Sequence, residues 1–161
     1  MHARARELID ALRLAPHPEG GFYRETWRSA ARVTTAPGRA RTATTHIHFL
    51  LAAGGFSAWH RVTSDETWNW HEGDELELLL ATPGLDRIER RRLGRVAEGC
   101  EPSFTVPADW WQAARPLGDY ALCGCTVSPG FEFADFSFLR DGAGDGRAAL
   151  ARLAPDLLPL L

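Results

Sequence analysis

Short runs of alternating apolar and polar residues fill most of this chain, with glycine and proline between them. Residues 75–81 read Glu-Leu-Glu-Leu-Leu-Leu-Ala and predict a core strand, and residues 119–127 predict another apolar strand. About nine such runs recur at intervals of roughly 8 to 12 residues, the spacing typical of an all-β sandwich or barrel. The pattern therefore predicts a mainly β protein.

Apolar residues at helical spacing occur near the start of the chain. Leu8, Ile9 and Leu12 share one face of a segment that is otherwise charged, which predicts an amphipathic helix over residues 3–14. Pro16 ends this helix. We expect one domain over residues 1–161. After the helix comes a strand core at about residues 17–139, which includes a loop at residues 29–41. A tail follows at residues 141–161, in which a Gly/Asp linker (141–147) precedes a short helical segment (148–161).

Residues 54–73 predict the strand pair around which the chain is organised. A polar turn at residues 63–65 joins the two strands. Because side chains alternate along a strand, His60 shares one face of the first strand with Phe56 and Val62. A histidine thus lies on the apolar face that we expect to point into the protein.

The second strand of this pair places a carboxylate among aromatic residues. Glu66 shares one face with Trp68 and Trp70. If that face also points inward, the Glu66 carboxylate and the His60 imidazole meet in the interior. Polar groups in an apolar interior cost free energy unless they are paired or used. We therefore take His60 and Glu66 as the centre of a candidate site.

The same segment resembles a known motif. The spacing of Gly54, His60, Glu66 and Gly73 is similar to the first motif of the cupin superfamily, in which two histidines two residues apart precede a glutamate. Val62 stands at the second histidine position of that motif. The resemblance implies a barrel whose first-motif metal ligands here would be one histidine and one glutamate.

Residues 107–112, Pro-Ala-Asp-Trp-Trp-Gln, resemble the second cupin motif, a proline turn followed by a histidine. Gln112 occupies the histidine position and Asp109 the glycine position. The resemblance implies a divalent metal cofactor (Mn, Fe, Ni or Zn) at His60 and Glu66, with the Gln112 side-chain oxygen as a weak third ligand. We expect this site to bind the metal with lower affinity than a cupin with the full ligand set does.

Over nearly its whole length, from residue 3 to about residue 139, the chain resembles the cupin-5 group of small single-domain microbial cupins. This resemblance implies a double-stranded β-helix, a jelly-roll barrel open at one end, with an N-terminal helix. Cupins of this branch are commonly dimers, and the aromatic strand expected at residues 131–138 leaves apolar surface, so we expect a homodimer. The matching segments are residues 17–26, 59–62, 65–68, 72–74, 106–108, 111–116 and 124–136.

Such a barrel would enclose an apolar cup with a few convergent polar groups, the usual composition of a small-molecule site. Tryptophan faces suit ring-shaped ligands such as sugars, aromatic acids or bases. The alternative is that the aromatic side chains plug the barrel. The expected inward-facing residues are Phe56, Trp68, Trp70, Trp110 and Gln112, together with His60 and Glu66.

The segment after the first helix has two interpretations. His17, Glu19, Tyr23 and Glu25 lie in or beside a strand that follows a Gly-Gly turn. Either this strand is an exposed edge, or these four side chains reach the rim of the pocket. Tyr23 and Glu25 are therefore candidate ligand-binding residues.

Three functions fit the expected cup. A metal-dependent enzyme would use His60, Glu66 and Gln112 around an ion with open positions. A metal-free sugar epimerase or isomerase would pair the His60 imidazole with Glu66 or Asp65 and abstract a proton next to a carbonyl. A non-catalytic module would bind or sense the same small molecule without turnover.

Two further histidines lie on one face of a predicted strand. His46 and His48 are two residues apart within residues 42–51, and such a pair can chelate a metal. The alternative is a pair on a half-solvated face, since the sequence supplies no obvious third ligand for them.

Composition excludes several other classes. The net charge of -3 and the absence of a basic stripe argue against a nucleic-acid partner. The chain contains no lysine, which excludes a lysine Schiff base, and no apolar run near 20 residues, which argues against a membrane span. The start of the chain lacks the apolar core of a signal peptide. We interpret the three cysteines as reduced thiols and expect a cytoplasmic protein.

Overall fold

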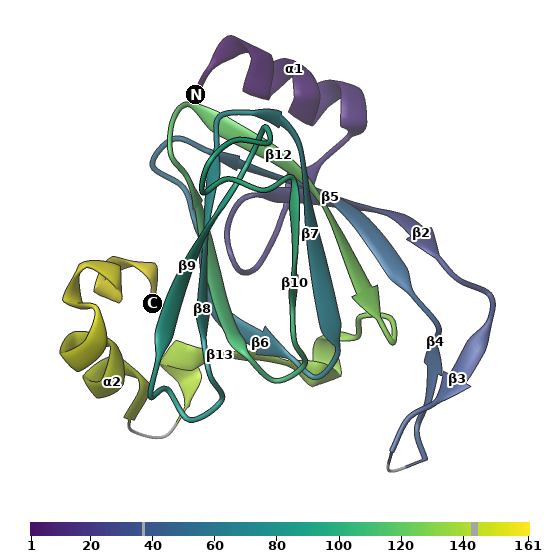
Figure 1. Ribbon diagram of the computed structural model, residues 1–161. Helices are drawn as coiled ribbons and strands as arrows, with labels where there is room; N and C mark the ends of the chain where they lie inside the picture. Colours follow the sequence, from purple (N-terminus) through teal and green to yellow (C-terminus); the bar gives the residue numbers. More distant parts are fainter. Residues whose placement is uncertain (37, 143–144) are drawn as a thin grey trace.

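The computed structural model describes residues 1–36, 38–142 and 145–161. Two antiparallel sheets pack face to face to form a barrel (Figure 1). The larger sheet contains, in spatial order, β1 (Ala15–Pro16), β2 (Phe22–Arg28), β5 (Thr45–Ala52), β12 (Tyr120–Ser128), β7 (Asp65–Gly73) and β10 (Ser103–Val106). The smaller sheet contains β13 (Phe136–Phe138), β6 (Ser57–Val62), β11 (Trp111–Pro116), β8 (Leu76–Ala81) and β9 (Ile88–Leu93).

The all-β prediction is confirmed, and so is the N-terminal helix. Helix α1 (Ala3–Leu12) ends two residues earlier than predicted, because Arg13 adopts a left-handed conformation with φ of 54°. The backbone N–H of Arg13 donates to the carbonyls of Asp10 and Ile9, which closes the last turn. The tail is helical in α2 (Asp145–Leu153) and in the 3-10 helix η3 (Pro155–Leu160).

The prediction of a loop over residues 29–41 is wrong for part of that segment. Strands β3 (Arg32–Thr34) and β4 (Ala40–Thr42) form a two-stranded hairpin that extends away from the barrel (Figure 1). Three-residue strands are too short to show a recognisable alternation. Buried Arg41 anchors the hairpin stem by donating to the Asp135 carboxylate and the Gly130 carbonyl. Residue 37 of the predicted loop and residues 143–144 of the predicted linker lie outside the described residues.

Three apolar clusters hold the layers together. The first fills the space between the two sheets, the second joins the smaller sheet to the C-terminal helices, and the third joins α1 to the larger sheet. Fully buried leucines of β8 point alternately into the first two clusters, with Leu78 inside the barrel and Leu79 outside it. None of the described helices has the length and apolar character needed to cross a membrane.

Leu78→Ala tests the inter-sheet core. The side chain is fully buried, and its loss removes apolar contacts and leaves a cavity, so the free energy of unfolding should fall by about 2–5 kcal/mol. Urea denaturation followed by tryptophan fluorescence measures this change. Val96→Ala is the control, because Val96 is 79% exposed and its truncation should change stability by less than about 0.5 kcal/mol. Equal stability of the two variants would contradict this assignment of the core.

Candidate functional site

A cavity of about 320 Å³ opens between the sheets, at the end of the larger sheet away from α1. Its walls come from inward-facing side chains of β2, β5, β6, β7 and β12, and from the segment 131–136. Both the N-terminal segment at residues 17–19 and the segment 131–136 contribute to the lining, so the cavity depends on parts of the chain far apart in sequence.

Four buried polar side chains gather in this cavity: His17, Glu19, His60 and Glu66. The Glu19 carboxylate is the hub. Its Oε2 lies 3.3 Å from Nε2 of His60 and 3.6 Å from Nδ1 of His17. Its Oε1 accepts a hydrogen bond of 2.9 Å from the Ser57 hydroxyl. Glu19, rather than Glu66, is therefore the carboxylate in direct contact with the His60 imidazole.

A tight turn brings Glu19 across β6. Gly20 and Gly21 both have positive φ, 111° and 70°, which glycine adopts without steric cost. A Cβ on Gly20 would lie 2.1 Å from the carbonyl oxygen of Phe56, so no other residue fits there. The turn leaves the Glu19 carbonyl 2.8 Å from the backbone N–H of Ala58, which fixes the segment to β6.

A bulge in β6 decides which of its side chains enter the cavity. His60 pairs with Gln112 and Ser57 with Ala114, so two residues of β6 lie opposite the single residue Ala113. The bulge turns Ser57 to the same face as His60, where its hydroxyl reaches Glu19. As a consequence Phe56, which simple alternation places inside, packs instead against the outer cluster of the smaller sheet.

The tautomer of His60 follows from its contacts. Its Nδ1 lies 2.7 Å from the carbonyl oxygen of Ala58, which only accepts, so Nδ1 carries the proton. Nε2 is then a free acceptor directed toward Glu19. The ring stacks on Phe136 with centroids 5.1 Å apart, which fixes its orientation.

Glu66 is held by a chain of buried hydrogen bonds. Trp68 Nε1 donates to Gln112 Oε1 at 2.8 Å, and Gln112 Nε2 donates to Glu66 Oε2 at 2.6 Å. An indole nitrogen can only donate, so it fixes which end of the Gln112 amide faces Trp68. Gln112 therefore supports Glu66 from behind and does not line the cavity.

Burial sets the protonation of this cluster. It raises the pKa of Glu19 to about 8, against a smaller lowering by the Ser57 hydroxyl, and raises the pKa of Glu66 to about 7. Burial lowers the pKa of His17 to about 4 and also lowers the pKa of His60. Near neutral pH both imidazoles are uncharged, and the Glu19 carboxyl carries a proton that the His60 Nε2 can accept.

Aromatic rings and a charged group complete the cavity. Phe131 and Phe133 meet edge to face with centroids 5.0 Å apart, and Tyr23 packs against the ring of His17. At the mouth, Arg28 lies 2.8 Å from Glu25 and 3.2 Å from Glu132. The site thus combines an apolar wall with a buried cluster of ionisable groups and a charged entrance.

The structure brings together only part of the expected site. His60, Glu66, Tyr23 and Glu25 line the cavity, as do His17 and Glu19. Trp68 is fully buried behind it. Trp70 and Trp110 lie elsewhere in the described structure and do not line the cavity.

Position along the strands explains the two displaced tryptophans. Trp70 lies four residues beyond Glu66 on β7, and its indole N–H donates to the carbonyl of Asp74. Trp110 precedes β11 and lies under the guanidinium of Arg87. Asp65, the alternative partner for His60, is exposed and accepts from the backbone N–H of Ala108, outside the cavity.

Sequence reasoning missed Glu19 as the partner of His60 and the aromatic wall at residues 131–136. The Gly-Gly pair after Glu19 signals a tight turn, but nothing in the spacing shows that this turn crosses β6. The aromatic pattern of Phe131, Phe133 and Phe136 was visible in the sequence, although its place over the cavity depends on tertiary packing.

The donor set expected from the cupin motifs does not fit an ion as arranged. The Gln112 oxygen, the only atom of that side chain suited to a metal, accepts from Trp68. Among the described residues, one group of three His, Cys, Asp or Glu side chains has its ligand atoms close enough to share an ion, and it lies outside the cavity.

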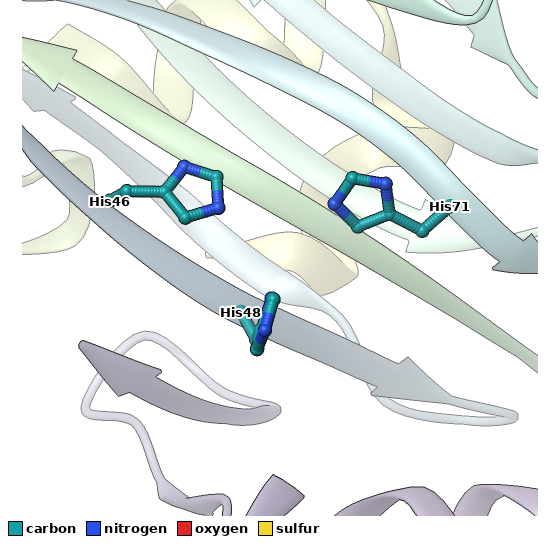
Figure 2. Close-up of side chains that lie close together, drawn as sticks. All are labelled: His46, His48 and His71. Carbon is teal, nitrogen blue, oxygen red and sulfur yellow. The ribbon is translucent and has the colours of Figure 1, made fainter. Parts of the chain in front are cut away.

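That group consists of His46 and His48 on β5 and His71 on β7 (Figure 2). Its potential ligand atoms all lie within 4.8 Å of one another. His71 is the third histidine that the sequence did not reveal beside His46 and His48. Close packing of this kind makes the three side chains able to hold a metal.

The family model described as Cupin_5, cupin superfamily (DUF985), matches residues 6–139. A hypothetical protein from Leishmania major is 34% identical with a TM-score of 0.81, covering 97% of this chain and 95% of that one. A protein from Shewanella oneidensis is 33% identical with a TM-score of 0.80, covering 97% and 93%.

More distant structures share the fold alone. Oxalate decarboxylase from Bacillus subtilis has a TM-score of 0.59 at 14% identity, covering 91% of this chain and 36% of that one. No curated protein sequence matches the chain significantly.

The raised pKa of Glu19 makes stability depend on pH. Above about pH 6.5, the folded protein keeps a proton on Glu19 that the unfolded chain releases, so stability falls as the pH rises toward about 8. The free energy of unfolding should drop by on the order of 2 kcal/mol over this window. Between about pH 4 and 6.5, the lowered pKa of His17 acts in the opposite direction, whereas the raised pKa of Glu66, about 7, adds to the loss of stability up to about pH 7.

Urea denaturation at several pH values from 6.5 to 8 measures this slope. Glu19→Gln keeps the shape of the protonated carboxyl and should flatten the slope, whereas the exposed Glu98→Gln should leave it unchanged. An unchanged slope in Glu19→Gln would show that Glu19 is ionised throughout.

Proposed function

Because the chain belongs to the Cupin_5 family of the cupin superfamily, we propose that its barrel cavity binds a small ring-shaped ligand, and that His60 and Glu19 transfer protons on it without a metal. One observation carries this proposal. The Nε2 atom of a buried, uncharged imidazole faces a carboxyl group 3.3 Å away, inside a cavity. The class of reaction that fits is isomerisation or epimerisation next to a carbonyl.

The walls support a ring-shaped ligand. A cavity of about 320 Å³ lies at the small end of ligand-site volumes and suits a molecule with a single ring. Phe131, Phe136 and Tyr23 offer flat apolar surfaces for such a ring. Arg28 at the mouth can bind a hydroxyl or carboxylate of the ligand if it exchanges Glu25 or Glu132 for it.

The protonation states support acid–base chemistry. The free Nε2 of His60 accepts a proton from the carbon next to the ligand carbonyl, and the protonated carboxyl of Glu19 or Glu66 donates a proton to the carbonyl oxygen. The product of this step is an enol. Its hydroxyl returns its proton to the carboxylate, and a proton added to the opposite face of the carbon gives the epimer. A pKa of about 7 for Glu66 and about 8 for Glu19 places both acids close to neutral pH, where such transfer is efficient.

The oligomeric state, a homodimer, stays a prediction. Trp27 on β2 is 60% exposed and Val33 on the β3–β4 hairpin is 37% exposed, so this side of the barrel presents apolar surface. We expect a symmetric homodimer that covers part of it. Light scattering at micromolar concentration should give twice the mass of one chain, and Trp27→Glu should shift the mass toward one chain. A monomeric mass for the unchanged protein would contradict this.

His60→Gln tests the proton transfer. Exchange of the ligand's carbon-bound hydrogen in deuterated water, followed by NMR with a panel of hexoses, hexuronic acids and cyclic keto acids, reports the reaction directly. The variant should still bind the ligand in a thermal-shift assay but lose exchange by about 10²- to 10⁴-fold, because the base is gone. Glu19→Gln should also lose exchange.

His2→Ala is the matched control, because His2 is an exposed histidine at the start of α1. It should keep both binding and exchange. Binding without any exchange in the unchanged protein would indicate a non-catalytic binding module. A folded His60→Gln variant that matches the unchanged protein in every assay would overturn the proposal.

A further inference from the structure

The outer face of the larger sheet carries three histidines directed at one point. His46 and His48 belong to β5 and His71 to β7, and strand β12 lies between them. Figure 2 shows the three imidazole rings turned toward one another above the sheet. Their potential ligand atoms lie within 4.8 Å of one another. No residue of this cluster lines the cavity of the proposed function.

A glycine on β12 makes room for the rings. Gly124 pairs with His48 of β5 on one side and Asn69 of β7 on the other. A Cβ on Gly124 would lie 2.5 Å from Nε2 of His71 and 3.0 Å from Nε2 of His46. Both Nε2 atoms therefore lie over the same position, which any larger residue would occupy.

A bulge in β7 aims His71 at this position. Trp70 pairs with Cys123 and Glu72 with Leu122, so His71 is the extra residue of the strand. Glu72 points to the outer face, where it accepts from Tyr120. His71 lies on the same face, with its Nε2 over Gly124.

Two features of the imidazole nitrogens prepare them for a metal. Nδ1 of His46 lies 2.8 Å from the Thr126 hydroxyl, which leaves its Nε2 free to face the cluster. Metal-bound histidines usually have such a partner on the second nitrogen. Nδ1 of His48 is buried and has no hydrogen-bond partner in the described structure, which is costly unless it is used.

We propose that His46, His48 and His71 bind one divalent transition-metal ion of the zinc type on the outside of the barrel. Imidazole nitrogen suits Zn²⁺, Ni²⁺ and Cu²⁺, whereas Mg²⁺ and Ca²⁺ take oxygen ligands. A tetrahedral zinc ion brings its nitrogens to roughly 3.3 Å from one another. The three imidazoles, whose ligand atoms lie within 4.8 Å of one another, therefore move closer when the ion binds. Three protein ligands leave a fourth position, and His71 is exposed, so this position faces solvent.

A positive charge close to the cluster selects the fourth ligand. Arg24 of β2 pairs with His48 across the sheet. Its guanidinium opposes a bare cation but stabilises an anion bound to that cation. We therefore expect hydroxide, a carboxylate or phosphate as the fourth ligand of the ion.

Zinc titration of chelator-treated protein tests the site. A competing chromophoric chelator reports affinity, and Co²⁺ absorption reports the coordination number. We expect one Zn²⁺ per chain, no competition from millimolar Mg²⁺, and a tetrahedral Co²⁺ spectrum. His71→Ala changes an exposed side chain, so it should fold normally and weaken zinc affinity at least tenfold. His2→Ala should keep the affinity of the unchanged protein.

Two further variants sharpen the test. Thr126→Val keeps the shape of the side chain but removes the partner of His46, and should weaken zinc affinity by about 10- to 100-fold. His60→Gln, inside the cavity, should leave zinc affinity unchanged. Loss of zinc in His60→Gln would place the ion in the cavity and overturn the proposal. Zinc affinity that is unchanged in both His71→Ala and His46→Ala, or the absence of any zinc binding, would overturn it as well.

Discussion

The pairing of β12 with β5 on one side and β7 on the other is the constraint on which both sites depend. Because side chains alternate, each of these three strands supplies the cavity from one face and the outer surface from the other. Cys125 and Val127 line the cavity, while Gly124 and Thr126 between and beside them serve the histidine cluster. One set of backbone hydrogen bonds therefore positions the proposed acid–base site and the proposed metal site on opposite faces of the same sheet.

The interior of the cavity shows how a barrel tolerates ionisable groups. Four such side chains share a buried space, and full ionisation would cost more than their contacts return. Burial instead shifts each pKa toward the uncharged form. Ser57 and Gln112 each donate one hydrogen bond to a carboxyl group, and the Ala58 carbonyl accepts one from His60, which fixes the orientation of the groups. The uncharged state of the cluster thus follows from desolvation, and the fixed orientation of its groups follows from these hydrogen bonds.

Alternation and turn spacing were enough to predict the β fold, the N-terminal helix and the inward faces of His60 and Glu66, which line one cavity without touching. They failed wherever a strand departs from regular geometry or a contact joins distant segments. The β6 bulge reversed the face of Phe56, and the β7 bulge brought His71 beside histidines of another strand. The contact of Glu19 with His60 depends on a turn that crosses β6, which no local pattern encodes.

The sequence of β5, Thr-His-Ile-His-Phe, also protects the fold against mispairing. A register slip by one residue would turn His46 and His48 into the barrel and expose Ile47 and Phe49 to water. Both changes are unfavourable, because the buried imidazoles would lack hydrogen-bond partners and the apolar side chains would be exposed to water. The histidines that make the outer cluster therefore widen the energy gap between the native register and its nearest competitor.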